Sequence, residues 1–120
     1  MALRGIRGAI QLDVDERDHL LAATRELVSA VMRANDLAAD DLVSIVFTCT
    51  PDLTSEFPAV AARELGLGSV PLLCAVEVDV PGAMPRVVRL LALAETERAR
   101  DAVQHVYLRG AVALRRDIAQ

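Results

Sequence analysis

The sequence is short of aromatic side chains and of basic clusters. Tryptophan is absent, and the aromatic residues are Phe47, Phe57 and Tyr107. The net charge is −4, and no block of basic residues interrupts the chain. A protein that binds nucleic acid usually needs a basic surface and rings on which bases stack, so we expect no nucleic-acid partner. The hydrophobic core must instead be built from Val, Leu, Ile and Ala.

Cysteine and long apolar runs are also scarce. Cys49 and Cys74 are too few for a disulfide framework, and we expect Cys49 to be a core residue. The N-terminus has no signal-peptide pattern, and no apolar run is long enough to span a membrane. We therefore expect a single cytoplasmic domain over residues 1–120, without a membrane partner. Part of the 53% hydrophobic residues should be buried between subunits, because so small a chain has much surface for its volume.

Side chains typical of covalent or metal-dependent catalysis are missing as well. His19 and His105 are the only histidines, and no His or Cys residues have metal-ligand spacing. The segment RGIRG at residues 4–8 does not match a glycine-rich nucleotide loop. No Ser or Cys nucleophile lies near an obvious base in the sequence. We therefore expect neither a metal nor a cofactor.

Hydrophobic periodicity and turn residues predict the element order β-α-β-α-β-β-β. Asp13 or Asp15 is expected to cap the first helix, and Asp52 to cap a turn after Pro51. The order predicts an α+β (α/β) fold, with both helices packed on one mixed sheet. The expected strands cover residues 3–12, 41–50, 70–80 and 86–95, the helices cover 13–36 and 57–66, and the last element, 105–115, is a strand that passes into a helical turn at Gly110.

Arginine is the conspicuous polar residue in apolar surroundings, as in VVRLLALAE at residues 87–95. The arginines near strands form pairs with odd spacing, so that one member of each pair should face inward. Convergence of several guanidinium groups would bind a small polyanion, because their forks match carboxylates. The alternative is that they are ordinary surface residues with one salt bridge each. The pairs are Arg4 and Arg7, Arg86 and Arg89, and Arg115 and Arg116, and the convergent set would be Arg7, Arg63, Arg89 and Arg115.

Several motifs, taken in order, resemble the chorismate mutases of the small trimeric α/β-barrel type, the AroH class. The match runs in register over nearly the whole chain, and the motifs are specific when taken together. They are RGIRGA at residues 4–9, TPDLTSEFPAVAAREL at 50–65, VPLLCAVEVDVPGAMPRVVRLL at 70–91, and HVYL with AVALRRD at 105–117.

The resemblance implies conversion of chorismate to prephenate, in phenylalanine and tyrosine biosynthesis. This [3,3] rearrangement is unimolecular and needs no nucleophile, metal, cofactor or proton transfer. The resemblance also implies a homotrimer, a trimeric pseudo α/β-barrel with active sites in clefts between subunits. An assembly of this kind would bury the excess of aliphatic surface.

The resemblance further implies roles for individual residues. Arg89 contacts the ether oxygen of the substrate, and Glu77 holds the ring hydroxyl. Arg7 binds a substrate carboxylate, with Tyr107 beside the same group. Cys74 lies near the ring hydroxyl, although it is three residues from Glu77 and in a straight strand would face the opposite way. Either the strand ends or bends between Cys74 and Glu77, or Cys74 acts through its backbone.

Other implied site residues come from different segments. Phe57, Ala59 and Arg63 correspond to the contribution of the adjacent subunit, and Leu114 and Arg115 to a C-terminal segment that closes over the site. Val60 and Leu73 depart from the pattern, since some relatives carry Lys and Thr at these positions. Leu73 is nevertheless expected to line the substrate site.

Two other functions remain open at this point. One is a trimeric deaminase of the reactive-imine type, which would need an activated water, for which Glu77 is the one acid with a matching position. The other is a non-catalytic, metabolite-binding regulatory domain. Single residues also have plain structural explanations, because Cys74 can be a small core residue and Tyr107 a core ring with a tethered hydroxyl.

Overall fold

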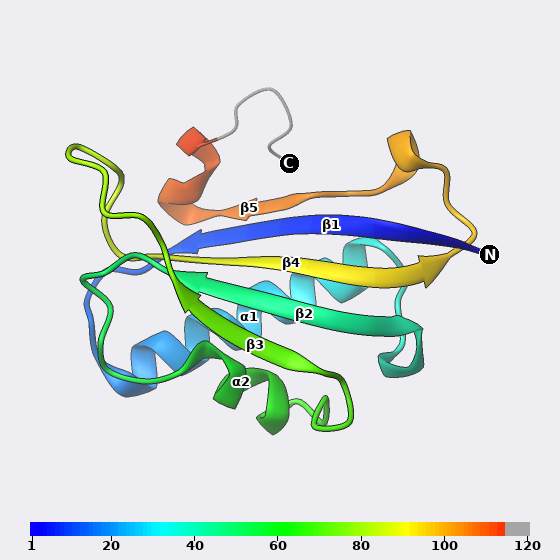
Figure 1. The fold of residues 1–120 in the computed structure, drawn as a ribbon, viewed down its shortest axis with the longest axis horizontal. Coiled ribbons are helices and arrows are strands. Elements are labelled where there is room, and N and C mark those ends of the chain that lie inside the picture. Colours follow the sequence, from blue (N-terminus) through cyan, green and yellow to red (C-terminus); the bar gives the residue numbers. More distant parts are fainter. Residues whose placement is uncertain (115–120) are drawn as a thin grey trace.

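A five-stranded mixed sheet forms the centre of the computed structural model, which describes residues 1–114 (Figure 1). The strand order across the sheet is β3-β2-β4-β1-β5. Strand β4 pairs antiparallel with β1 and β2, whereas β5 pairs parallel with β1 and β3 parallel with β2. The predicted mixed sheet is thus confirmed. Its strands are β1 (Ala2–Gln11), β2 (Leu42–Cys49), β3 (Leu72–Val76), β4 (Val87–Thr96) and β5 (Val106–Leu108).

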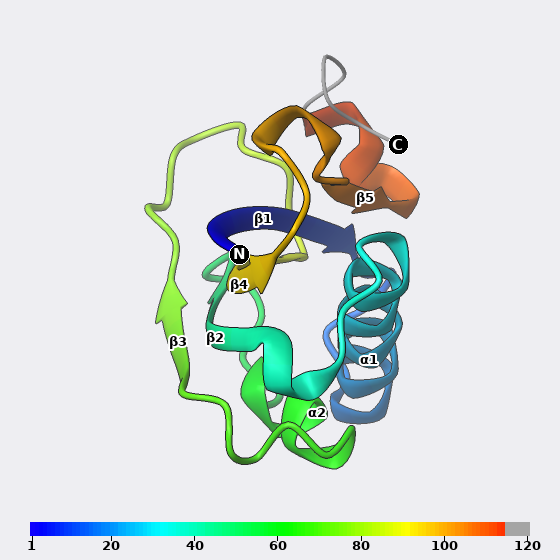
Figure 2. The same ribbon diagram turned by 90° about the vertical axis from the view of Figure 1, so that its right-hand side faces the viewer.

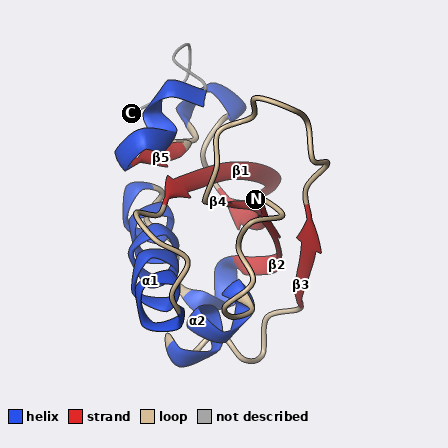
Figure 3. Cartoon of the chain, turned by 90° about the vertical axis from the view of Figure 1, so that its left-hand side faces the viewer, coloured by secondary structure: helices blue, strands red, loops and turns tan. Residues whose placement is uncertain are grey.

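Both helices, α1 (Arg17–Ala34) and α2 (Pro58–Glu64), pack on the same face of the sheet (Figures 2 and 3). Helix α1 approaches β1 so closely that a Cβ atom on Gly8 would lie 3.1 Å from Val31 Cγ2. Large aliphatic side chains and Phe47 fill the space between the two layers. Over most of its area the opposite face of the sheet is not covered by a helix of residues 1–114, and we call it the open face. No helix within residues 1–114 is long and apolar enough to cross a membrane.

The C-terminal end of the described chain covers one end of the open face. Strand β5 passes at Arg109, with a φ of 55°, into the 3-10 helix Arg109–Leu114. The prediction of a strand that passes into a helical turn is therefore confirmed. A small second core forms beneath this turn. It consists of Ala9, Val87, Tyr107 and Ala111, with Met84 and Leu114 packed against them.

Strand β3 ends earlier than predicted. The expected strand reached residue 80, but β3 ends at Val76, and the last backbone bond to β2 runs from Glu77 N to Cys49 O at 2.9 Å. Strand β2 ends at Cys49, so within the described part of the chain the residues beyond Glu77 have no strand beside them to pair with. Asp52 does not cap its own turn, because its carboxylate accepts from the Arg86 amide at 3.0 Å and so holds the chain that leads into β4.

The N-terminal cap of α1 also differs from the prediction. Glu16, rather than Asp13 or Asp15, is the cap, and its carboxylate accepts from the amides of Asp18 and His19. Asp15 instead reaches the loop before α2 and accepts from Thr54 and Ser55. Hydrogen bonding from Ser55 and then from Thr54 holds the pKa of Asp15 below its ordinary value.

This lowered pKa predicts a pH-dependent contribution to stability. Asp15 is ionised more readily in the folded than in the unfolded chain, so its contribution is complete above the unfolded pKa of about 3.9 and is lost as the pH falls through the folded pKa. Asp15→Asn should therefore lower the free energy of unfolding at pH 7, and the difference from wild type should shrink toward pH 3. Urea denaturation at both pH values measures this, and a difference independent of pH would contradict it.

Candidate active site

The open face carries an ionic cluster that three adjacent segments bring together. Thr48 on β2 lies in register with Arg89 on β4 and with Ala75 on β3. Glu77 directly follows β3 and continues its pairing with β2, so its side chain emerges on the same face as Arg89 and Thr48. The register of the sheet therefore determines where the three polar side chains meet.

The central contact is an ion pair in which Arg89 Nε lies 3.2 Å from Glu77 Oε2. Thr48 Oγ1 lies 2.6 Å from the same carboxylate oxygen. The Arg89 side chain is 44% exposed and that of Glu77 19% exposed, so the guanidinium is paired and partly hydrated rather than isolated in a dry core. This arrangement explains why an apolar strand tolerates an arginine.

Thr48 is a member of this cluster that the sequence analysis missed. The alternation in IVFTC at residues 45–49 places Thr48 on the face opposite Phe47. This was the one sequence feature that could have suggested Thr48 as a site residue. The pattern alone gives no register between strands, so it did not indicate that Thr48 reaches Glu77.

A hollow of about 210 Å³ opens beside the ionic cluster. Glu77 and Arg89 form one side of it, and Asp52 and Met84 belong to the two loops that form the rest. Pockets for small ligands usually measure about 300–1,000 Å³, so this hollow is small for such a pocket.

Arg7 lies farther along the open face, on β1. It lines a second hollow of about 400 Å³ with Leu91 and His105, and its backbone amide donates to His105 Nδ1 at 3.0 Å. Within residues 1–114 the Arg7 guanidinium forms no ion pair. Arg4, the other member of its predicted pair, donates from Nε to the Arg98 carbonyl at the end of the sheet.

Tyr107 and Leu114 lie in the second core, at the end of the open face nearest Ala9. Ala9 is the register neighbour of both Tyr107 and Arg89, so Tyr107 lies two strands from the ionic cluster. Its ring is buried and only 5% exposed. Arg115, predicted to close over the site together with Leu114, lies outside the described residues.

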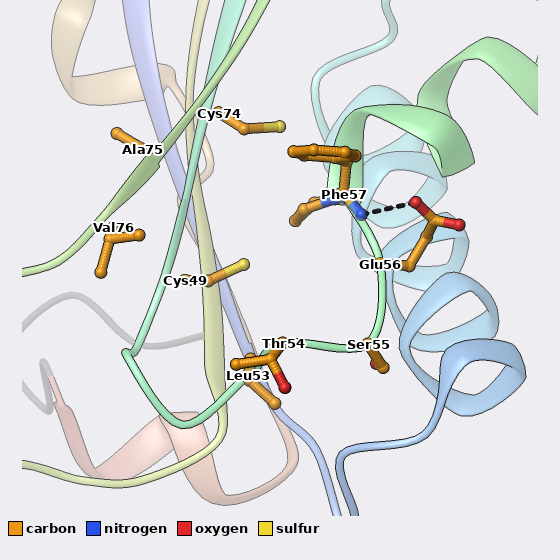
Figure 4. A pocket seen from close by; sticks show the side chains of 10 residues that line it. Cys49, Leu53, Thr54, Ser55, Glu56, Phe57, Cys74, Ala75 and Val76 are labelled. Carbon is orange, nitrogen blue, oxygen red and sulfur yellow. Dashed lines mark hydrogen bonds between the residues drawn. The ribbon is translucent and has the colours of Figure 1, made fainter.

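Cys74 lies on the helix-covered side of the sheet, away from Glu77. It lines a cavity of about 310 Å³ with Cys49 and with Phe57, which is 66% exposed. Figure 4 shows both sulfur atoms pointing from the strands toward the segment that carries Phe57. Burial raises the pKa of the Cys49 thiol to about 12, so it remains protonated at neutral pH, as expected for a core residue.

The predicted site residues thus form two separate groups within one chain. The open face holds Arg7, Leu73, Glu77 and Arg89, and Leu73 is 62% exposed there. The segment around α2 holds Phe57 and the exposed Arg63, whereas Ala59 is buried in the main core. Within residues 1–114, no three His, Cys, Asp or Glu side chains are grouped as metal ligands.

Comparisons with known proteins agree with this fold. The family model of chorismate mutase type I matches residues 3–118. Chorismate mutase AroH of Thermus thermophilus is 51% identical over 97% of this chain and 96% of its own length. Chorismate mutase AroH of Bacillus subtilis is 37% identical over 99% of this chain and 94% of its own.

A solved structure gives the same result. The chorismate mutase from Clostridium thermocellum superposes with a TM-score of 0.90 at 38% identity, and the match covers 91% of this chain and 97% of that one. Two near full-length relatives, the family model and the shared fold all point to one enzyme class, an isomerase. The chain therefore belongs to the chorismate mutase type I family, and chorismate mutase is the activity that its sequence and fold support.

Proposed function

We propose that this enzyme converts chorismate to prephenate, in the biosynthesis of phenylalanine and tyrosine, by holding the substrate in its reactive conformer and stabilising charge on its ether oxygen. The observation that carries the mechanism is the Arg89–Glu77 ion pair beside a hollow on the open face. It places a fixed cation and an acceptor carboxylate next to each other at a solvent-accessible site. The proposal requires no cofactor and no metal.

The chemistry suits a site made of fixed charges. In the rearrangement the ether C–O bond breaks while the new C–C bond forms within the same molecule, so atoms and electrons balance without a second reactant. Bond breaking runs ahead of bond formation, and negative charge develops on the ether oxygen. Arg89 stabilises this charge in the transition state more than in the ground state, while Glu77 accepts a hydrogen bond from the ring hydroxyl.

Arg7 is the proposed partner of a substrate carboxylate. Its guanidinium forms no ion pair within residues 1–114, and it lies on the same face as Arg89, two residues farther along the neighbouring strand in the register. A guanidinium without a protein partner is available for a bidentate contact with a carboxylate. Tyr107, at the covered end of the same face, is proposed to lie beside that carboxylate.

The second group of residues is proposed to act on the site of a neighbouring subunit in a homotrimer. Apolar side chains on the open face support such an assembly, since Leu3, Leu73 and Leu91 are each at least half exposed. The hollow of about 210 Å³ next to Arg89 is also small for a complete site. Phe57, Ala59 and Arg63 are the residues proposed to come from the neighbour.

The remaining predicted residues keep lining roles in the proposal. Leu73 and Cys74 belong to the strand that borders the site, and Cys74 would contribute through its backbone, because its side chain lies on the other face of the sheet from Glu77. Leu114 and Arg115 would close the site from the C-terminal side. A cytoplasmic location also remains a prediction.

The direct test of the function is the loss of chorismate absorbance in the ultraviolet, together with identification of prephenate as the product. The rate should change little between about pH 6 and pH 9, because no general acid or base takes part. A bell-shaped kcat profile with a solvent isotope effect would favour the deaminase. Binding of chorismate without turnover would favour a regulatory domain.

Arg89→citrulline should lower kcat by about 10²–10³-fold, because it keeps the shape and removes the charge that faces the ether oxygen. Arg89→Lys, which keeps a charge, should lose less. Arg25→citrulline is the matched control, since Arg25 also forms an ion pair, 2.7 Å from Glu64, but between the helices. If Arg89 only stabilises the fold, its citrulline variant will unfold more easily and keep its kcat, which would contradict the proposal.

Two inactive variants should complement each other if sites are shared between subunits. Arg89→Ala and Arg63→Ala disable opposite sides of the site, and random mixing in trimers would leave about a quarter of the sites intact. The two variants should be unfolded together and refolded, then assayed and sized by light scattering. No recovery of activity in the mixture, or a fully active monomer, would contradict the shared site.

A further inference from the structure

We propose that Thr48 is a positioning residue that fixes the Glu77 carboxylate for the substrate. The inference rests on the proposed function, in which Glu77 accepts a hydrogen bond from the ring hydroxyl. Thr48 is not expected to touch the substrate. Its role is to determine which oxygen of the Glu77 carboxylate contacts the protein and which remains free to accept a hydrogen bond from the substrate.

The geometry of the hydrogen bond supports this role. Thr48 Oγ1 lies 2.6 Å from Glu77 Oε2, which is the short distance typical of a hydroxyl that donates to a carboxylate. An ionised carboxylate only accepts, so the hydroxyl of Thr48 must be the donor. Thr48 is half-buried in the middle strand of three, so its own position is fixed by backbone pairing on both sides.

Both protein contacts are made to the same oxygen. The closest approach of Arg89 to Glu77 is also to Oε2, at 3.2 Å. Within residues 1–114, Glu77 Oε1 accepts no hydrogen bond. With two groups holding Oε2, the carboxylate is prevented from rotating, and Oε1 remains the oxygen that a substrate hydroxyl can approach.

The ion pair alone would not fix this orientation. Arg89 is long and 44% exposed, and a guanidinium can satisfy either oxygen of a carboxylate. Thr48 is short and branched at Cβ, with few side-chain conformers. The hydroxyl therefore supplies the directional contact, and Arg89 supplies the charge.

Thr48→Val tests the role, because it removes the hydroxyl and keeps the branched shape. It should lower kcat about tenfold, since a lost hydrogen bond to a charged group has an effect of this order, with little change in KM. Thr48→Ser keeps the donor and should restore most of kcat. Ser44→Ala is the matched control, because it removes a hydroxyl from the same face of β2 and should leave kcat unchanged.

A double-variant comparison separates positioning from a general effect on the strand. In a Glu77→Ala background there is no carboxylate to position, so adding Thr48→Val should lower kcat no further. An equal loss in both backgrounds would overturn the inference, and so would a Thr48→Val enzyme with wild-type kcat. If the wild-type chain converts no chorismate, the proposed function fails and the role of Thr48 fails with it. If the wild type is active and Thr48→Val has the same kcat, the role of Thr48 is rejected and the proposed function stands.

Discussion

Both α-helices of residues 1–114 pack on one face of the sheet, and this constraint governs the rest of the molecule. Large side chains of β1, β2 and β4 fill the helix-covered face, and the layers pack so closely that a Cβ atom on Gly8 would lie 3.1 Å from Val31 Cγ2. Because side chains alternate along a strand, the residues between them must emerge on the open face. The same alternation that builds the core therefore also selects which residues are exposed together on the open face.

Apolar and charged residues lie side by side on the open face. Leu73 and Leu91 are largely exposed, and Arg89 and Glu77 form an ion pair close to them. An apolar surround lowers the local dielectric and strengthens each electrostatic contact, provided that the charges remain paired. Partial exposure avoids most of the cost of burying these ions.

Local patterns in the sequence predicted most of the fold. Alternation and turn residues predicted the mixed sheet, both helices and the turn after β5. For Cys74 and Glu77 the sequence left alternatives open, and in the structure the two side chains lie on opposite faces. Contacts between segments distant in the sequence were harder to predict. Asp15 accepts from Thr54 instead of capping the helix, and β3 ends where its neighbouring strand ends. No local sequence pattern predicts either feature.

The same limit applied to the candidate site. The resemblance singled out Arg89 and Glu77, which are in contact in the structure, but it did not indicate Thr48. Finding Thr48 requires the register of β2 against β4, which depends on three-dimensional pairing rather than on spacing along the chain.

A sheet is a suitable scaffold for a reaction that needs no proton transfer. General acid–base chemistry needs groups with tuned proton affinity, whereas an intramolecular rearrangement needs fixed charges and a restricted substrate. Backbone pairing fixes Thr48 and Arg89 relative to each other, and the last β2–β3 bond fixes Glu77 beside them. In the proposed mechanism, charges held in this way need no reorganisation as the ether bond breaks, which is the condition under which electrostatic stabilisation is most effective.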